Sequence, residues 1–292
     1  MEVSRRNQPI MFNGSHLDRQ RAVKCAGRLI IVVATLAAVP CGAQVSLGLS
    51  PMRVEIAMDP GSSWSGALRL NNEADDPVRV RTELLDFQLD SETTPQFADA
   101  IEAEKKFSCR DWLMVNPMET EVAPHTHLQV RFSVQIPADA RVSSYHCGIG
   151  FTTMSAVRSI PIGLRAAVRV VSTLYVTVGN PPLEGQLAGL KLEPVRAGSM
   201  KSWRAVALIS NPSRRYFRPT GELALLDESG RVLESVPFKP LPVLEERIQR
   251  FVFPLTTAEI RPGYHLRARV DLGTGDIQEG DVEVSPAIAE LR

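Results

Sequence analysis

Apolar and polar residues alternate with a period of two over a long stretch, residues 159–178, "SIPIGLRAAVRVVSTLYVTV". Every even position carries an apolar or small side chain, whereas Arg165, Arg169 and Thr177 stand at odd positions. Because successive side chains of an extended chain point to opposite faces, the pattern predicts a β-strand with one apolar and one polar face. An ordinary strand has ~3 to 10 residues. The run is therefore one long strand that overhangs its own domain, or two strands joined near Pro161–Gly163.

Shorter alternating runs, separated by Pro, Gly, Asn and Asp, fill most of the chain before this stretch. With the long run they predict seven strands, which suffice for one immunoglobulin-like sandwich. One segment, Ala98–Lys106, has a helical composition and lies in a connection between strands. The six shorter runs are 51–58, 65–72, 78–90, 112–117, 127–136 and 145–154.

The second half of the chain repeats the order of the first. "SWRAVALISNPSRRYFRP" echoes "SWSGALRLNNEADDPVRV", and each has a Trp, an alternating strand and an Asn before a polar turn. This alignment pairs Trp203 with Trp64 and Asn211 with Asn71. The echo predicts that a second sandwich follows the first.

A Tyr-His pair opens a later strand in both halves, at Tyr145 and at Tyr264. In immunoglobulin-like folds a tyrosine at this place bonds back to the backbone of the preceding corner. We therefore expect an all-β protein of two immunoglobulin-like β-sandwich domains, residues 44–180 and 181–292.

The first 43 residues have the pattern of a cleaved export signal. A basic region is followed by the apolar run Leu29–Val39 and by the small-residue sequence Cys41-Gly42-Ala43, and Met11 is an alternative start. Eleven apolar residues are too few to span a bilayer, and no other run approaches that length. We therefore expect no integral membrane segment after cleavage.

Charge and cysteine usage narrow the function further. The chain has 33 basic and 33 acidic residues, and residues 44–292 carry 27 against 31. This balance disfavours nucleic acid as a partner. In an exported protein the remaining pair, Cys109 and Cys147, predicts a disulfide. Closing that loop contributes ~4 kcal/mol in the chain-entropy model.

The residues do not assemble into a recognisable catalytic or metal site. His125 and His127 could bind a metal together with His146 or Cys147. They follow Pro124 in a turn, however, where a hydrated polar surface is the commoner explanation. No Gly-x-Ser-x-Gly elbow and no glycine-rich phosphate loop occur in the sequence. We therefore expect neither enzymatic activity, nor a metal, nor a cofactor.

From Leu49 to Val178 above all, the chain resembles the periplasmic chaperones of the chaperone-usher pilus pathway. The resemblance rests on the order and spacing of "SPMRVEI", "PGSSWSGALRLNN", "DWLMVNPMETEVAPHTHLQVRFSVQIP" and "RVVSTLYVTV". It implies two immunoglobulin-like domains, a periplasmic location, and secreted pilin-like subunits and an outer-membrane usher as partners. The alternative is a structural or adhesive protein of the cell envelope, at the cell surface, that uses two sandwiches as binding modules.

The resemblance also implies a mechanism for the opening segment. Such chaperones donate an alternating segment, which leads into the seventh strand, to a subunit that lacks its own last strand. The alternative is that the segment folds back on its own domain. The donated residues would be Ile160, Ile162, Leu164, Ala166, Val168 and Val170.

Members of that family hold the subunit's terminal carboxylate with two cations. The resemblance places Arg53, in "PMRVEI", at the first position. It places Val171 where the family has a lysine, which departs from the pattern. Arg169 lies two residues earlier on the same face of the strand and could bind the same carboxylate.

Overall fold

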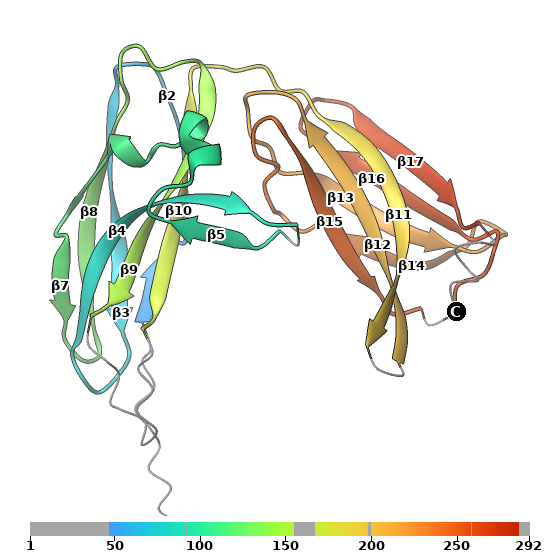
Figure 1. The fold of residues 1–292 in the computed structure, drawn as a ribbon, viewed down its shortest axis with the longest axis horizontal. Coiled ribbons are helices and arrows are strands. Elements are labelled where there is room, and N and C mark those ends of the chain that lie inside the picture. Colours follow the sequence, from blue (N-terminus) through green and yellow to red (C-terminus); the bar gives the residue numbers. More distant parts are fainter. Residues whose placement is uncertain (1–46, 92, 155–166, 198–199, 258, 286–292) are drawn as a thin grey trace, which may run out of the picture. The chain divides into compact units, whose positions relative to one another are not determined.

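The strands of the first half of the chain form two sheets that enclose one apolar core (Figure 1). The computed structural model describes residues 47–285 except 92, 155–166, 198–199 and 258, and residues 43–292 belong to one compact unit. One sheet has the order β1-β3-β8-β6, and the other has β2-β10-β9-β4-β5, with β7 paired to β4. The strands are β1 (Leu47–Ser50), β2 (Arg53–Met58), β3 (Ser63–Asn72), β4 (Val78–Leu89), β5 (Pro95–Ala98), β6 (Leu113–Asn116), β7 (Glu119–Val122), β8 (Thr126–Gln135), β9 (Ser143–Thr153) and β10 (Arg169–Val178).

Period-two alternation builds this first sandwich, as the sequence predicts. In β3 and β8, for example, Leu68 lies opposite Val130, and both side chains are fully buried. Each of the seven predicted runs contains a strand, although only residues 169–178 of the run 159–178 are a described strand and residues 159–166 lie outside the described residues. The short strands β1, β5 and β7 are additional. The three additional strands have four residues each. The segment expected to be helical contains the end of β5 and the 3-10 helix η1 (Glu102–Phe107).

β10 is paired differently along its two edges. It is antiparallel to β9 over its whole length, whereas β2 runs parallel to it only from Thr173 to Val178. In the described part of the chain, residues 169–172 of β10 therefore have a strand neighbour on one side only. Leu174, Val176 and Val178 point into the first core.

The second half of the chain forms a second sandwich with its own core. A sheet of order β11-β12-β15 lies against one of order β14-β13-β16-β17. Gly230, with φ of 81°, closes the turn between β13 and β14 at "DESG". The strands are β11 (Gln186–Ala197), β12 (Met200–Asn211), β13 (Thr220–Leu226), β14 (Val232–Pro237), β15 (Arg247–Leu255), β16 (His265–Asp271) and β17 (Ile277–Glu283). The all-β fold of two sandwiches is confirmed, while the domain limits at residues 180 and 181 stay predictions.

The internal repeat is real, but the alignment of its asparagines is wrong by one residue. Asn72 is buried, and its amide donates to the carbonyls of Asp76, Val122 and Ala123 at 2.8, 3.0 and 3.3 Å. Asn211 is buried in the same way, and its amide donates to Arg215, Val243 and Leu244 at 2.9, 3.1 and 3.0 Å.

Each of these asparagines follows the repeat's tryptophan by eight residues. Asn71, the residue chosen from the sequence, instead accepts a hydrogen bond from Arg69 near the surface. The tyrosine corner is confirmed at Tyr145, whose hydroxyl donates to the carbonyl of Arg141 at 2.9 Å.

The contacts of Asn72 lead to a stability prediction. Asn72→Ala should lower the free energy of unfolding by about 3 kcal/mol, because three carbonyl groups lose their donor in a buried site. Asn71→Ala, the matched control, should change it by less than about 0.5 kcal/mol. Urea unfolding of both variants measures the difference, and equal effects would contradict the repeat described here.

Candidate functional site

The site expected from the sequence begins where the free edge of β10 begins. Val168 closes the end of β9 through its backbone, since its carbonyl accepts from the Thr153 amide and its amide donates to Thr153 Oγ1, both at 3.0 Å. Val170 is half-buried and packs against the first core. Ile160, Ile162, Leu164 and Ala166 lie outside the described residues, so their role as donated residues stays a prediction.

The two arginines expected to bind one carboxylate have different partners. Arg53 on β2 is half-exposed, and its Nε lies 3.1 Å from Oε1 of Glu55. Arg169 on β10 has its Nε 2.9 Å from Oε2 of Glu83 and also donates to Thr152 Oγ1.

In the strand register, Arg53 stands opposite Thr173, four residues beyond Arg169. At about 3.3 Å per residue this offset separates the two arginines by ~13 Å along the strand. Arg53 and Arg169 are not brought together in the structure, and a shared carboxylate stays a prediction.

Arg218 is a cation at this site that sequence analysis missed. It lies in the segment between β12 and β13, and its Nε is 3.1 Å from Oε1 of Glu55, the same oxygen that contacts Arg53. Its guanidinium also stacks 4.8 Å from the centroid of the Tyr175 ring. Arg218 and Glu55 are 163 residues apart, so no local pattern could have paired them.

The pKa values of the two tyrosines beside Arg218 are changed by this environment. The Tyr175 and Tyr216 rings lie 4.8 Å apart. Burial raises the pKa of Tyr216, and the negative charge of Glu55 raises it further. Burial also raises the pKa of Tyr175, although the charge of Arg218 opposes that effect. Both hydroxyl groups therefore stay protonated at physiological pH, and Arg218 faces neutral rings.

A second cluster is fully buried and centred on His146 of β9. Its neighbours Tyr145 and Cys147 face the first core, so alternation directs His146 away from that core. There, Nε2 lies 3.1 Å from Oε2 of Glu104 in η1, and Nδ1 lies 3.3 Å from Oε2 of Glu245 in the second sandwich. The second contact has an ion-pair distance without hydrogen-bond geometry. Arg247 donates to the other oxygen of Glu104.

These neighbours change the titration of the buried groups. Burial alone would lower the pKa of His146, but the hydrogen bond to Glu104 and the negative charges of Glu104 and Glu245 raise it to about 9. Burial alone would raise the pKa of Glu104, but His146 and Arg247 lower it. At neutral pH the cluster therefore contains two cations and two carboxylates, so the buried charges balance.

The predicted disulfide lies next to this cluster and is confirmed. Cys109 follows η1 and is bonded to Cys147, the residue after His146. The amide of Cys109 also donates to the carbonyl of His146 at 3.3 Å. The bond therefore fixes η1, with Glu104, over β9. From the sequence, His146 was considered only as a possible metal ligand beside His125 and His127, and its burial was not predicted because Glu245, which contacts it, lies far away in the sequence.

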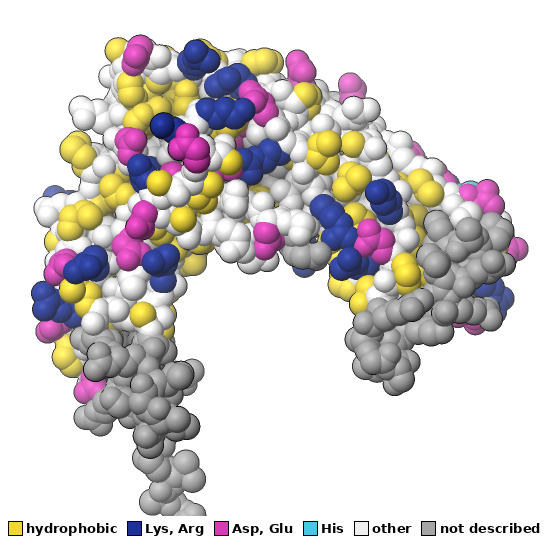
Figure 2. All heavy atoms as spheres, in the orientation of Figure 1, with side chains coloured by type: hydrophobic (Ala, Val, Ile, Leu, Met, Phe, Trp, Pro, Cys, Tyr) yellow, Lys and Arg dark blue, Asp and Glu magenta, His cyan; other side chains and the backbone are white. Residues whose placement is uncertain are grey.

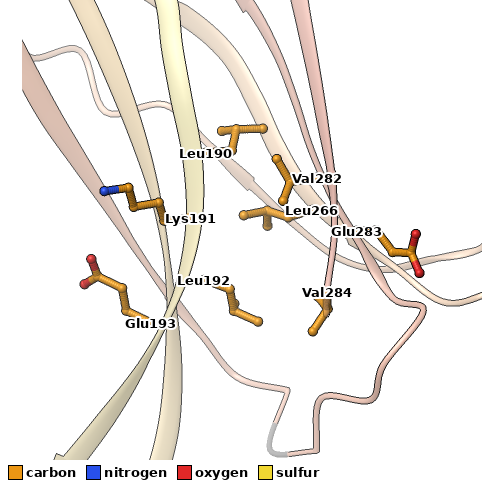
Figure 3. A pocket seen from close by; sticks show the side chains of 8 residues that line it. All are labelled: Leu190, Lys191, Leu192, Glu193, Leu266, Val282, Glu283 and Val284. Carbon is orange, nitrogen blue, oxygen red and sulfur yellow. The ribbon is translucent and has the colours of Figure 1, made fainter. Parts of the chain in front are cut away.

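A hollow of about 210 Å³ opens into the second core between β11 and β17. Leu190, Leu192, Leu266 and Val284 line it, while the charged groups of Lys191 and Glu193 point away from it (Figure 3). Polar groups do not converge inside this hollow, so we assign no chemistry to it.

Comparison with known proteins finds similar proteins only among solved structures. No family model and no curated protein matches the sequence. Similar solved structures include the CupB2 chaperone of Pseudomonas aeruginosa, with 16% identity and a TM-score of 0.40 over 82% of this chain and 100% of that chain. Another is the CsuC–CsuE complex of a chaperone with a tip adhesion subunit, from Acinetobacter baumannii. It has 10% sequence identity and a TM-score of 0.40 over 82% of this chain and 99% of that chain.

A third structure, the Salmonella enterica SafA pilin in complex with the SafB chaperone, gives 14% identity and a TM-score of 0.38 over 82% of this chain and 97% of that chain. Pilus-assembly chaperones are thus prominent among the structures that this chain is similar to. Likenesses at these identities and scores do not decide the function, which rests on the chain's own residues.

Two features of the described residues bear on possible partners. None of their helices is both long and apolar enough to cross a membrane. On the face shown in Figure 2, basic and acidic side chains lie interspersed, without a broad area of positive charge. This distribution agrees with the balanced charge of the sequence.

The raised pKa of His146 predicts that stability depends on pH. A histidine with a folded-state pKa near 9 and an unfolded value near 6.5 contributes fully below about pH 6.5, and the contribution is lost as the pH rises to about 9. We expect the free energy of unfolding to fall by on the order of 1 kcal/mol per pH unit between pH 7 and 9. Urea unfolding across that range measures the slope.

His146→Gln should be less stable at pH 7 and should show no such slope. His265→Gln, which replaces a half-exposed histidine paired with Asp281, is the control and should keep the slope of the unmodified protein. A slope that persists in His146→Gln would contradict this assignment. NMR titration of the imidazole protons provides a direct second measurement.

Proposed function

We propose that this chain is a periplasmic chaperone that captures secreted pilin-like subunits by strand addition and has no catalytic step. One observation carries the proposal: among the described residues, residues 169–172 of β10 pair with β9 and with no strand along their other edge, and this half-strand continues the alternating run that begins at residue 159. Residues 1–43 would direct export and would then be removed.

A free edge of this kind suits a partner that contributes a strand. Backbone N–H and C=O groups along the edge would pair with the incoming chain, and alternate side chains of the donated segment would fill pockets in the partner. Pro161 has no N–H, so pairing there would be one-sided.

The place where β2 begins limits how far an added strand can extend. β2 takes this edge of β10 from Thr173 onward, starting at Arg53. A strand added along residues 169–172 therefore ends against Arg53. A positive charge at that point favours a carboxyl terminus, and the added strand would then run parallel to β10, as β2 does.

An uncovered apolar segment would be an aggregation hazard, so it needs a cover. A bound subunit would bury Ile160, Ile162 and Leu164, and an outer-membrane usher would then receive the complex. If the segment instead folds back on the first sandwich, its apolar side chains belong to the protein's own core. A charge introduced into this segment would disrupt subunit binding in the first case and the stability of the free protein in the second.

Ile162→Asp separates them. If Ile162 contacts only the subunit, the free energy of unfolding of the free variant should lie within about 0.5 kcal/mol of that of the unmodified protein. Capture should be lost, because an unpaired carboxylate in an apolar groove costs several kcal/mol. Capture is measured by co-expression with a pilin-like subunit, followed by co-purification from the periplasm.

Ile277→Asp is the matched control, because Ile277 is an exposed isoleucine on β17 of the second sandwich. It should change neither thermal unfolding nor capture. A large loss of stability in Ile162→Asp, with no loss in Ile277→Asp, would refute strand donation. Unimpaired capture by a stable Ile162→Asp protein would refute it as well.

A further inference from the structure

The second sandwich has an open side between the edge strands of its two sheets. β11 pairs with β12 and β17 pairs with β16, so in the described part of the chain each has one edge without a strand neighbour. The apolar hollow of about 210 Å³ lies between these two edges. Its described lining offers no convergent polar groups for catalysis, but an opening between two strand edges can accept an additional strand.

One end of this opening is already closed. Gln278 of β17 bonds to the backbone of β11 through both ends of its side-chain amide. Its nitrogen donates to the carbonyl of Gly185 at 2.8 Å, and its oxygen accepts from the amide of Leu187 at 2.7 Å. A Cβ atom at Gly280 would lie 2.7 Å from the Leu187 side chain, so the two strands are also in close contact there. An added strand therefore cannot enter at this end.

The other end of the opening lacks a cover in the described part of the chain. The side chain of Val282 points into the hollow (Figure 3), yet 37% of this residue is exposed. Leu190 and Leu192, on the β11 side, are only 9% and 8% exposed. The uncovered apolar surface thus belongs to β17, and the open part of its edge is residues 281–284.

Charged side chains form rows across the outer face of the sheet that contains β17. β16 carries a basic row, and β17 carries an acidic row in register with it. The register pairs are His265 with Glu283, Arg267 with Asp281, and Arg269 with Glu279. Since opposite charges on neighbouring strands stabilise their pairing, this register favours the pairing of β16 with β17.

The acidic row of β17 is compensated from one side only. Nε of Arg267 lies 2.8 Å from Oδ2 of Asp281 and 3.8 Å from Oε1 of Glu279. Glu283 is exposed and has no ion-pair partner among the described residues. A strand added beyond β17 would therefore be favoured if its outward side chains were lysine or arginine. A charged edge of this kind disfavours neutral and acidic strands.

The other edge strand, β11, belongs to a sheet of opposite charge. Strands β11, β12 and β15 contain six lysines and arginines but one acidic residue, Glu193. Oε2 of Glu193 lies 3.0 Å from Nε of Arg204 and 2.5 Å from Nη2 of Arg250. A basic strand paired with β11 would face like charges, which is unfavourable. The charges of the two sheets therefore direct a basic strand to β17.

We propose that the edge of β17 at residues 281–284 binds an extended segment of another protein in which apolar residues alternate with lysine or arginine. The apolar side chains enter the hollow against Val282, and the basic side chains lie beside Asp281 and Glu283. The second sandwich then holds a partner independently of the edge of β10, so this inference goes beyond the proposed function.

Three synthetic peptides test the proposal. They are acetyl-Lys-Val-Lys-Val-Lys-Val-amide, acetyl-Lys-Ser-Lys-Ser-Lys-Ser-amide and acetyl-Glu-Val-Glu-Val-Glu-Val-amide. Isothermal titration at low ionic strength should show that the Lys-Val peptide binds about tenfold or more tightly than either of the others. The Lys-Ser peptide cannot fill the apolar hollow, and the Glu-Val peptide is repelled by the carboxylates. Added salt should weaken binding of the Lys-Val peptide, because the ion pairs are exposed.

Two variants locate the binding site. Glu283→Lys should bind the Lys-Val peptide about tenfold more weakly than the unmodified protein does, because a like charge replaces an opposite one. Glu222→Lys is the matched control, since it changes the net charge equally but lies on β13, which β16 separates from β17. It should bind as the unmodified protein does. Hydrogen exchange should show that the bound peptide protects residues 281–284 and leaves residues 169–172 unchanged.

The proposal is overturned if the Lys-Ser peptide binds as tightly as the Lys-Val peptide, or if none of the peptides binds. It is also overturned if Glu222→Lys weakens binding as much as Glu283→Lys does, because the attraction would then depend on net charge alone. Protection of residues 169–172 in place of residues 281–284 would overturn it as well.

Two other occupants of the hollow are distinguished in the same experiments. If the Lys-Val peptide binds only after removal of residues 286–292, the chain's own terminus is the occupant and the proposal is overturned. If the unmodified protein forms dimers that Glu283→Lys dissociates, a second copy is the occupant and the proposal is likewise overturned. Subunit capture is measured separately by co-purification, so failure at β17 is distinguishable from failure of the proposed function.

Discussion

The buried ion cluster around His146 is the interaction on which the joining of the two sandwiches most depends. A charged imidazole lies between Glu104 and Glu245, with less than 2% of any of these side chains exposed, and Arg247 completes the balance. Breaking one partner of a buried ion pair is strongly destabilising, because the remaining charge has neither solvent nor a counter-ion. Residues of the first sandwich, of η1 and of the second sandwich are therefore held together by one set of charges.

The disulfide and the surrounding contacts reinforce this arrangement. Because Cys109 is covalently bonded to Cys147, Glu104 is held close to His146 by a short path of covalent bonds. Lys106 of η1 binds Glu246 at 2.5 Å, and the amide of Ser144 donates to the carbonyl of Arg214 at 2.7 Å. Each contact joins residues from both halves of the chain. The ion pair of Arg53 with Glu55 differs, because 49% and 40% of these side chains are accessible to water.

Residues with local signals could be predicted from the sequence, and residues whose role depends on distant partners could not. Alternation identified the long strands of the first sandwich, and the export context of the cysteines identified the disulfide. The ion pairs of His146 could not be predicted, because Glu245, which contacts it, lies 99 positions further along the chain. Arg218 gave no signal for the same reason. The pairing of Asn71 with Asn211 failed because two adjacent asparagines, Asn71 and Asn72, fit the same local pattern and only burial distinguishes them.

Asn72 and Asn211 hold their own turns with the same three-carbonyl arrangement, eight residues after a tryptophan in each half. Neither asparagine borrows an acceptor from the other half. Each half therefore contains the full set of groups that close its turn, and a damaging substitution in one is not relieved by the intact copy in the other. Although the two halves are similar, an intact asparagine in one half therefore does not compensate for a lost asparagine in the other. Natural variation should be restricted equally at both positions.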